Sequence, residues 1–298
     1  MANLKEVRNR IDSVKSTQQI TKAMKMVAAA KLRKAQDAII QMRPYAQKLN
    51  EVLANVSSTL ESSSDNAYGA ERENVKRVLI VVVTSDRGLC GGFNSNVIKQ
   101  VSAHIEANYA DLHAADNLEL LCIGKKAAEF FERRNFKINK DYVNTFMNLS
   151  FDAVKEAAEH VMAEFENGYY DKVDVVFNEF KNVATQIVRT QQYLPIVEEE
   201  ATTEEETTSE VDYIFEPDKE FIVQELIPKS LKLKLYTAVL ESNASEHGAR
   251  MTAMDKATDN AGELLKDLKL TYNRSRQAAI TTEILEIVGG AEALASGK

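Results

Sequence analysis

The chain of 298 residues is long enough for one large domain or two ordinary ones, and 44% hydrophobic with 28% charged residues is typical of a soluble globular protein. No apolar run reaches the roughly 18 residues of a membrane-spanning helix, and the N-terminus lacks an apolar signal core. We therefore expect an intracellular protein without a cleaved leader.

The net charge of −8 is distributed unevenly, because residues 1–50 hold eleven Lys or Arg and only three acids. A basic helix of this kind predicts an acidic partner around it, although a solvated helix face explains the pattern equally well. Nucleic acid is a weaker alternative, since Tyr45 is the single aromatic residue available for stacking in this segment.

Residues 1–60 are predicted to form one long helix, because Asn3 to Leu60 contains no glycine and a single proline. Apolar residues recur with the 3-4 spacing of a coiled coil at both ends of this segment. They are Leu4, Val7, Ile11 and Val14, and then Leu32, Ala35, Ile39, Met42, Ala46, Leu49, Leu53, Val56 and Leu60.

The middle of this helix, Lys15 to Lys31, departs from the pattern. Continuing the register puts Gln18, Thr21 and Lys25 in the seam, whereas Ile20, Met24 and Val27 are out of phase. We expect local unwinding or a loosened helix contact at Gln18–Val27, with Lys22 and Lys25 facing outward.

Residues 75–195 are predicted to form a Rossmann-like α/β domain with a mostly parallel sheet, because short apolar runs alternate with helical segments. The expected strands are 78–84, 118–124, 173–180 and 186–193, and the expected helices are 95–109, 125–133 and 151–167.

The last third of the chain begins with a connector at 196–217, in which residues 198–210 hold seven glutamates and are expected to be a solvated loop. Residues 218–298 are predicted to form a second long helix, whose proline-free stretch at 229–288 is about as long as the first helix. Its 3-4 spaced positions are Met251, Met254, Thr258, Ala261, Leu265, Leu268 and Tyr272. We expect the two helices to pair as a long antiparallel coiled coil.

The glycine-rich loop at 88–92 follows a strand and precedes a helix, as in dinucleotide-binding folds, but GLCGG lacks the required glycine spacing. A tight strand-to-helix turn is the simpler interpretation. The four histidines and two cysteines form no metal-ligand spacing, and both thiols are expected to be reduced. We therefore expect no catalytic residue, cofactor or metal in this chain.

Four motifs indicate a family. The C-terminal segment RQAAITTEILEIVGGA (276–291) resembles the signature of the γ subunits of F-type ATP synthases. ITKAMKMVAAAKL (20–32) resembles the first helix of that family, and TSDRGLCGG (84–92) resembles its central loop. ARMTAM (249–254) with ATDN (257–260) also agrees. The glutamate-rich loop departs from the family pattern, and the cysteine-bearing insert of the chloroplast forms is missing.

This resemblance implies a non-catalytic rotor shaft at the centre of a ring of three α and three β subunits. The ε subunit and the membrane c-ring contact its α/β domain, and proton-driven rotation changes the conformation of the β catalytic sites. In a bacterium the complex is peripheral to the cytoplasmic face of the inner membrane.

The resemblance also assigns partner contacts, for which an ordinary surface position on a coiled coil is the alternative. They fall on Lys22, Met24, Lys25, Arg250, Arg276, Gln277, Thr281 and Glu283. Two other functions stay open from the residues alone. The chain could be a structural coiled-coil adaptor with a globular head, or a nucleotide-dependent enzyme that uses the glycine loop.

Overall fold

The computed structural model describes residues 4–57, 68–69, 72, 74–196 and 219–297. The chain divides into two compact units, residues 29–250 and residues 1–28 with 251–298, which we describe separately. Both divisions fall inside long helices, so the predicted domain boundaries at 60, 75 and 218 stay predictions. The glutamate-rich loop, the predicted strand or turn at 212–217 and most of the predicted linker at 61–69 lie outside the described residues.

The unit of residues 29–250 is built on a five-stranded sheet in the order β3-β2-β1-β4-β5. Strands β1 (Val78–Val83), β2 (Leu118–Ile123), β3 (Lys137–Asn139) and β4 (Lys172–Phe180) are parallel, and β5 (Gln186–Leu194) runs antiparallel to β4. The expected mostly parallel sheet is thereby confirmed, while β3 was not predicted because it has only three residues and no apolar run.

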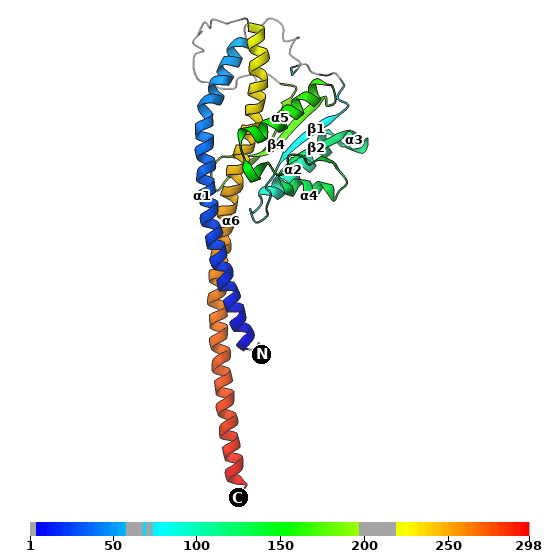
Figure 1. Ribbon diagram of the computed structural model, residues 1–298. Helices are drawn as coiled ribbons and strands as arrows, with labels where there is room; N and C mark the ends of the chain where they lie inside the picture. Colours follow the sequence, from blue (N-terminus) through cyan, green and yellow to red (C-terminus); the bar gives the residue numbers. More distant parts are fainter. Residues whose placement is uncertain (1–3, 58–67, 70–71, 73, 197–218, 298) are drawn as a thin grey trace. The chain divides into compact units, whose positions relative to one another are not determined.

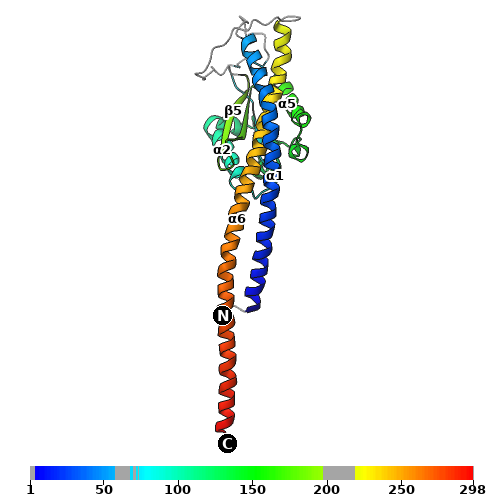
Figure 2. The same ribbon diagram turned by 90° about the vertical axis from the view of Figure 1, so that its left-hand side faces the viewer.

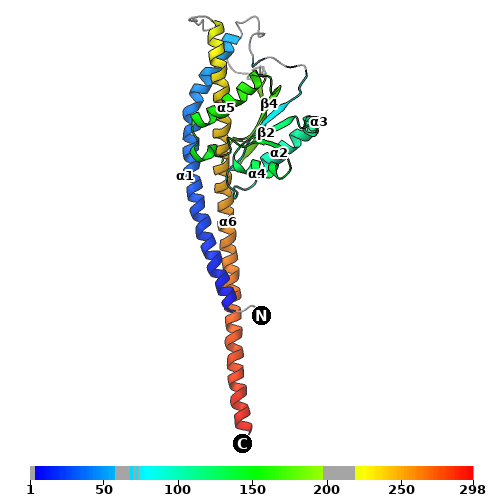
Figure 3. The ribbon, with the colours of Figure 1, turned by 45° about the vertical axis from the view of Figure 1, so that its right-hand side comes forward.

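The central strand β1 is buried on both faces, which explains its unbroken apolar sequence. Val78, Ile80 and Val82 contact the core under α2 (Phe93–Asn108) and α4 (Lys125–Glu132). Alternate β1 residues face the opposite core, under α5 (Phe151–Glu166) and the first part of α6. Figures 1 and 3 show α2 and α4 on one side of the sheet and α5 on the other. The short helices α3 (Ala110–Ala114) and η2 (Thr145–Asn148) complete the domain.

The N-terminal part of α6 is fastened to the sheet by both apolar and polar contacts. Leu231 and Leu235 are buried in the core under α5. The Tyr193 hydroxyl donates to the Leu231 carbonyl over 2.9 Å, and the Ser242 hydroxyl accepts from the Asn178 amide over 3.0 Å. This segment of α6 is therefore an integral layer of the α/β domain.

The two long helices are α1 (Leu4–Ser57) and α6 (Lys219–Ser296), of 54 and 78 residues. The prediction of two helices of about equal length is wrong. Both contain a proline, Pro44 in α1 and Pro228 in α6, and continue past it. Among the described residues, no helix combines the length and the apolar character needed to cross a membrane.

In the unit of residues 1–28 and 251–298, the two helices lie side by side and antiparallel, and α6 continues well beyond the start of α1 (Figures 1 and 2). Predicted 3-4 positions of both helices lie in the helix contact, where Val7, Met254, Ala261 and Leu268 are buried. This confirms the antiparallel coiled coil.

Candidate functional site

The glycine loop connects the end of β1 to the start of α2 through an unusual backbone path. Leu89 has φ +65° and Gly91 has φ +58°, so the chain enters the left-handed region twice within three residues. Cys90, between them, is buried against Phe93 and Ala249 of α6. The loop therefore folds back on α6 and leaves Arg87 to Leu89 as an exposed tip.

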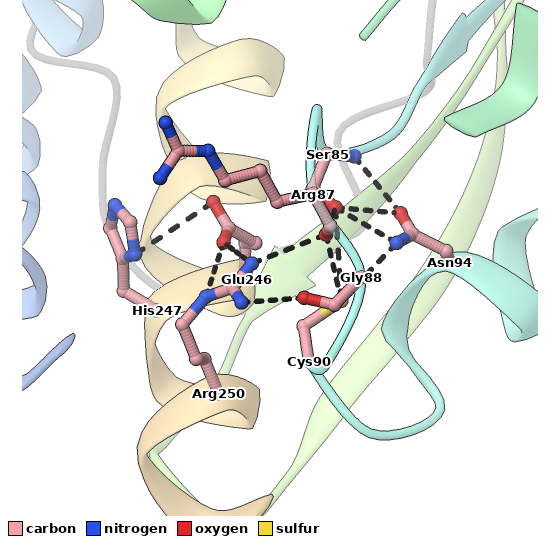
Figure 4. Close-up of polar contacts among 8 residues, drawn as sticks. All are labelled: Ser85, Arg87, Gly88, Cys90, Asn94, Glu246, His247 and Arg250. Carbon is pink, nitrogen blue, oxygen red and sulfur yellow. Dashed lines mark hydrogen bonds and ion pairs between the residues drawn. The ribbon is translucent and has the colours of Figure 1, made fainter. Parts of the chain in front are cut away.

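Arg250 of α6 binds this loop directly (Figure 4). Its Nη1 donates to the Gly88 carbonyl over 2.6 Å and its Nη2 donates to the Arg87 carbonyl over 3.2 Å. The other side of the guanidinium meets Glu246, one turn earlier in α6, with Nε and Nη2 at 2.9 and 2.5 Å from Oε1. We call this group of Arg250, Glu246 and the two loop carbonyls the loop clamp.

A second set of hydrogen bonds holds the base of the loop. The Ser85 amide donates to Asn94 Oδ1 over 2.9 Å, and Asn94 Nδ2 donates to Ser85 Oγ and Cys90 Sγ over 2.8 and 3.2 Å. The Ser85 hydroxyl in turn donates to the Arg87 carbonyl over 2.7 Å. The loop is thus fixed at its base by Asn94 and near its tip by Arg250.

These contacts favour a structural turn over a phosphate-binding loop. In doubly wound sheets, ligands bind beside the carboxyl ends of the strands at the point where the strand order reverses. Here α6 lies at that edge: Ala249 packs on the loop after β1, and Ser245 donates to the Asn178 carbonyl in β4. The interpretation as a tight strand-to-helix turn is favoured over a nucleotide site.

Burial shifts the pKa of two groups beside the loop clamp. Desolvation raises the pKa of the Asp86 carboxyl, an effect that the Lys125 amide and ammonium partly offset and that repulsion from Glu246 reinforces. Desolvation also lowers the pKa of His247, against the attraction of Glu246 and together with the repulsion of Lys31 and Arg250. His247 is therefore neutral near pH 7.

The polar middle of α1 stays in the seam of the helix pair. Thr21 Oγ1 lies 2.8 Å from Thr258 Oγ1, Gln18 Nε2 donates to the Thr258 carbonyl over 3.3 Å, and Lys25 Nζ lies 2.5 Å from Asp255 Oδ1. The expected unwinding at Gln18–Val27 is wrong, because α1 is helical throughout and its register continues. The expected outward Lys25 is also wrong, since its ammonium pairs with α6. Polar side chains keep this register because each finds a partner on the facing helix.

Apolar residues that are out of phase with the seam form a stripe on the outside of α1. Ile20 and Val27 are 59% and 57% exposed, and Met24, on the same face, is half-buried. Lys22 is exposed beside the seam. This surface suits contact with another subunit better than contact with water.

We call residues 276–292 the bare end of α6, because their side chains are exposed. Every residue from Arg276 to Glu292 is exposed. Large apolar side chains are concentrated here, with Ile280, Ile284, Leu285, Ile287 and Val288 between 48% and 66% exposed. Gln277, Thr281, Ile284 and Val288 share one face at spacings of 4, 3 and 4 residues, and Arg276 and Glu283 share another. Such a helix needs an enclosing partner to remove its apolar surface from water.

The predicted contact residues thus fall into three groups. Arg276, Gln277, Thr281 and Glu283 lie together on the bare end of α6, while Lys22, Met24 and Lys25 lie on α1 in the same unit. Arg250 belongs to the other unit, where its side chain is only 12% exposed and is held by internal contacts.

Sequence reasoning missed the partners of these residues. Glu246 could have been found, because an acid four residues before an arginine is a common helical pair. Asp255 and Thr258 carry no such signal, since their partners are more than 200 positions away.

The described residues contain no group of three or more His, Cys, Asp or Glu side chains placed to hold a metal ion. Both cysteines are free and buried, and burial raises the pKa of the Cys122 thiol to about 12. A thiol of this kind stays protonated and is a poor nucleophile.

Comparisons with known proteins agree with these features. A family model described as ATP synthase matches residues 3–294. The ATP synthase gamma chains of Cytophaga hutchinsonii and Flavobacterium johnsoniae are 63% and 56% identical over 294 residues, which is 99% of this chain and of each relative.

Solved structures show the same fold. A chain of the Euglena gracilis mitochondrial ATP synthase (OSCP/F1/c-ring) is 21% identical with a TM-score of 0.66, covering 99% of this chain and 95% of that one. A chain from the central stalk and c-ring of the Tetrahymena thermophila enzyme is 26% identical with a TM-score of 0.55, covering 80% and 99%. On this evidence the chain belongs to the family of ATP synthase γ chains.

Proposed function

We propose that this γ chain couples rotation to catalysis through two apolar surfaces of its helix pair, the outer stripe of α1 and the bare end of α6. The chain is a non-catalytic subunit and forms the central stalk of an F-type ATP synthase. Its partners are the F1 subunits and the c-ring. We expect three α and three β subunits around the helices, with ε and the c-ring at the α/β domain.

The bare end of α6 is the observation that supports this proposal most directly. A run of exposed apolar side chains on a single helix costs free energy in water, at about 25 cal/mol per Å² of apolar surface left uncovered. The cost disappears if a collar of subunits surrounds the helix. The contact free energy between these surrounding subunits and an asymmetric helix depends on the orientation of the helix. A difference in this free energy between two orientations drives a catalytic site from one conformation to another.

The magnitude required is modest for such a surface. Moving a catalytic site from mostly open to mostly closed takes about 5.5 kcal/mol of differential contact free energy. Burial of a few side chains of the size of Ile280 and Ile284 differs by that much between two orientations, at about 1.5–3 kcal/mol each. The shaft therefore needs a stiff, asymmetric surface and no catalytic group.

Within this proposal, Gln277 and Thr281 lie on the apolar face and orient the collar by hydrogen bonding, while Arg276 and Glu283 present charges on another face. Met24 belongs to the outer stripe, Lys22 lies beside the seam, and Lys25 lies in the seam, where it pairs with Asp255. We place the complex at the cytoplasmic face of a bacterial inner membrane, peripheral to the membrane and driven by protons. The bacterial relatives support this placement.

The coupling role is tested with Gln277→Leu and Met24→Lys in the assembled enzyme, beside Lys269→Met as an exposed control on α6. We expect both variants to reduce ATP-driven proton pumping more than ATP hydrolysis, because they alter contacts that depend on orientation. The control should keep the wild-type ratio. Wild-type rates and ratio in both test variants would contradict the assigned contacts.

The stalk assembly itself is tested by native mass spectrometry of the purified complex. One copy of this chain with three copies each of two larger ATP-binding subunits is expected. A solitary dimer or filament would contradict the shaft function.

A further inference from the structure

The tip of the glycine loop is held in an unfavourable conformation. Leu89 has φ +65°, which a residue with a branched side chain rarely adopts, and its side chain is 68% exposed. Within the loop, the Ser85 hydroxyl donates to the Arg87 carbonyl and helps to hold the base. A tip with this backbone conformation needs a further contact from outside the loop.

The loop clamp supplies that contact. The guanidinium of Arg250 reaches the Arg87 and Gly88 carbonyls, the two groups immediately before Leu89. Glu246 neutralises and orients the guanidinium from the other side, and the two side chains are only 12% and 13% exposed. Hydrogen bonds in which one partner is charged are stronger than bonds between neutral groups.

The geometry also requires arginine. Four contacts to three acceptors use the planar fork of the guanidinium, with two contacts to Glu246 and two to the loop (Figure 4). A lysine ammonium carries the same charge but is a single point and cannot span the carboxylate and both carbonyls. Arg250 is also the last residue of α6 in the compact unit that contains the α/β domain, so the clamp ties the loop to the end of this α6 segment.

We infer that Arg250 is a positioning residue that acts inside the chain: it locks the glycine loop to α6, so that the α/β domain and the helix turn as one body. This inference rests on the proposed shaft function and differs from the role that the family resemblance assigned, which was contact with another subunit. The lock matters because torque that enters at the α/β domain must reach α6 through contacts that do not slip.

Cys90 offers a direct probe of the lock in the full-length chain. Its thiol is 2% exposed beneath the loop, and Cys122, 0% exposed in β2, serves as an internal control. Labelling of each cysteine with a maleimide is followed by mass spectrometry in Arg250→Ala, Arg250→Lys and Glu246→Gln. Arg274→Ala, at an exposed arginine of the same helix, is the matched control.

We expect the labelling rate of Cys90 to rise about tenfold or more in Arg250→Ala, because loss of charge-assisted hydrogen bonds opens the loop. Arg250→Lys should show a similar rise, and Glu246→Gln a smaller one. Cys122 should be unchanged in every variant, as should Cys90 in Arg274→Ala. An unchanged Cys90 in Arg250→Ala and Arg250→Lys would overturn the inference. If Arg250→Ala exposes both thiols through unfolding, Arg250→Lys decides alone.

The assembled complex separates positioning from contact with another subunit. We expect Arg250→Ala and Arg250→Lys both to lower the number of protons pumped per ATP hydrolysed while the complex still assembles. Full rescue by lysine would mean that only the charge matters, and a contact with an acidic partner would replace the lock. Because the labelling experiment uses the chain alone, it is independent of the proposed shaft function, which the composition of the complex tests separately.

Discussion

The two units of this chain use opposite rules for placing apolar residues. In the unit of residues 29–250, the buried apolar side chains of the α/β domain form two main cores, one on each face of the sheet. In the unit of residues 1–28 and 251–298, the seam contains Gln18, Thr21 and Lys25, while Ile20 and Val27 face outward. The first unit is stabilised by burial of apolar side chains, whereas the second leaves apolar side chains exposed on its outer surface.

The difference shows how one chain separates stability from contact. The α/β unit can maintain its own structure, since its sheet is covered on both faces. The helix pair fixes its register by directional hydrogen bonds, which leaves its outer surface available. Four predictions test this contrast, in order of decreasing effect.

The largest effect is expected for Gly124→Ala, at the end of β2. Gly124 has φ +102°, and a Cβ there would lie 2.0 Å from the Thr84 carbonyl oxygen, a backbone atom that cannot move freely. We expect a loss of at least about 3 kcal/mol of unfolding free energy. Urea unfolding of the full chain, followed by circular dichroism, measures it.

Gly88→Ala is the matched control, because a Cβ at Gly88 meets nothing within 4 Å and φ lies outside the left-handed range. It should change the unfolding free energy by less than about 0.5 kcal/mol. Equal effects at the two glycines would contradict the close packing of the β1 and β2 ends.

The second prediction compares the same truncation at two positions of α6. Leu235 is 0% exposed in the domain core, and Leu285 is 65% exposed on the bare end. Leu235→Ala should cost about 2–5 kcal/mol in urea unfolding, because it leaves a cavity, whereas Leu285→Ala should cost less than about 0.5 kcal/mol. In the assembled enzyme we expect Leu285→Ala to reduce coupling more than Leu235→Ala does, provided the Leu235 variant folds. A large stability loss at Leu285 in the isolated chain would mean that the end of α6 has a partner within the chain.

The third prediction concerns the polar seam. A double-mutant cycle of Thr21→Val and Thr258→Val should give a coupling free energy of about 0.5–1.5 kcal/mol, because the two hydroxyls lie 2.8 Å apart across the helix pair. Thermal unfolding followed at 222 nm measures the four proteins of the cycle. Thr271→Val, an exposed threonine of α6, is paired with Thr21→Val as a control and should show additivity. Additive effects of the Thr21 and Thr258 substitutions would show that this hydrogen bond does not stabilise the register of the helix pair.

The smallest effect is expected from pH. Because burial lowers the pKa of His247 in the folded chain, the unfolded chain binds a proton more readily at this residue. Its contribution to stability is therefore complete above about pH 6.5 and is lost as the pH falls below that value, by at most about 1.4 kcal/mol per pH unit. Urea unfolding at pH 7.5 and 5.5 should show a smaller decrease in His247→Gln than in the wild type, and an equal decrease would contradict the neutral, buried histidine.

Much of the α/β unit could be predicted from the sequence. The run of valines in β1 and the period of α5, which is followed by Gly168 at φ +76°, are local signals, and both elements lie where they were expected. The family resemblance was also confirmed, because the family model matches residues 3–294. Strand β3 was missed, since three residues pair with β2 without any apolar pattern of their own.

The errors share a physical cause. The polar stretch of α1 was interpreted as a flaw because hydrophobicity was the criterion for a seam, but its partners Asp255 and Thr258 lie on the other long helix. Likewise, nothing near Arg250 indicates that its guanidinium binds a loop 162 residues earlier in the sequence. Hydrogen bonds between distant segments leave no local period.

The bare end of α6 has a consequence in terms of symmetry. Its apolar side, around Ile284 and Val288, differs from the side that carries Glu283 and Glu286, so the helix has no rotational symmetry about its own axis. In the proposed complex, a ring of three identical subunits would offer this helix three orientations of equal energy, about 120° apart. The ring would then set the angles at which the helix pauses. The chemical difference between the sides of the helix would determine which of the three surrounding subunits is in which state at each pause.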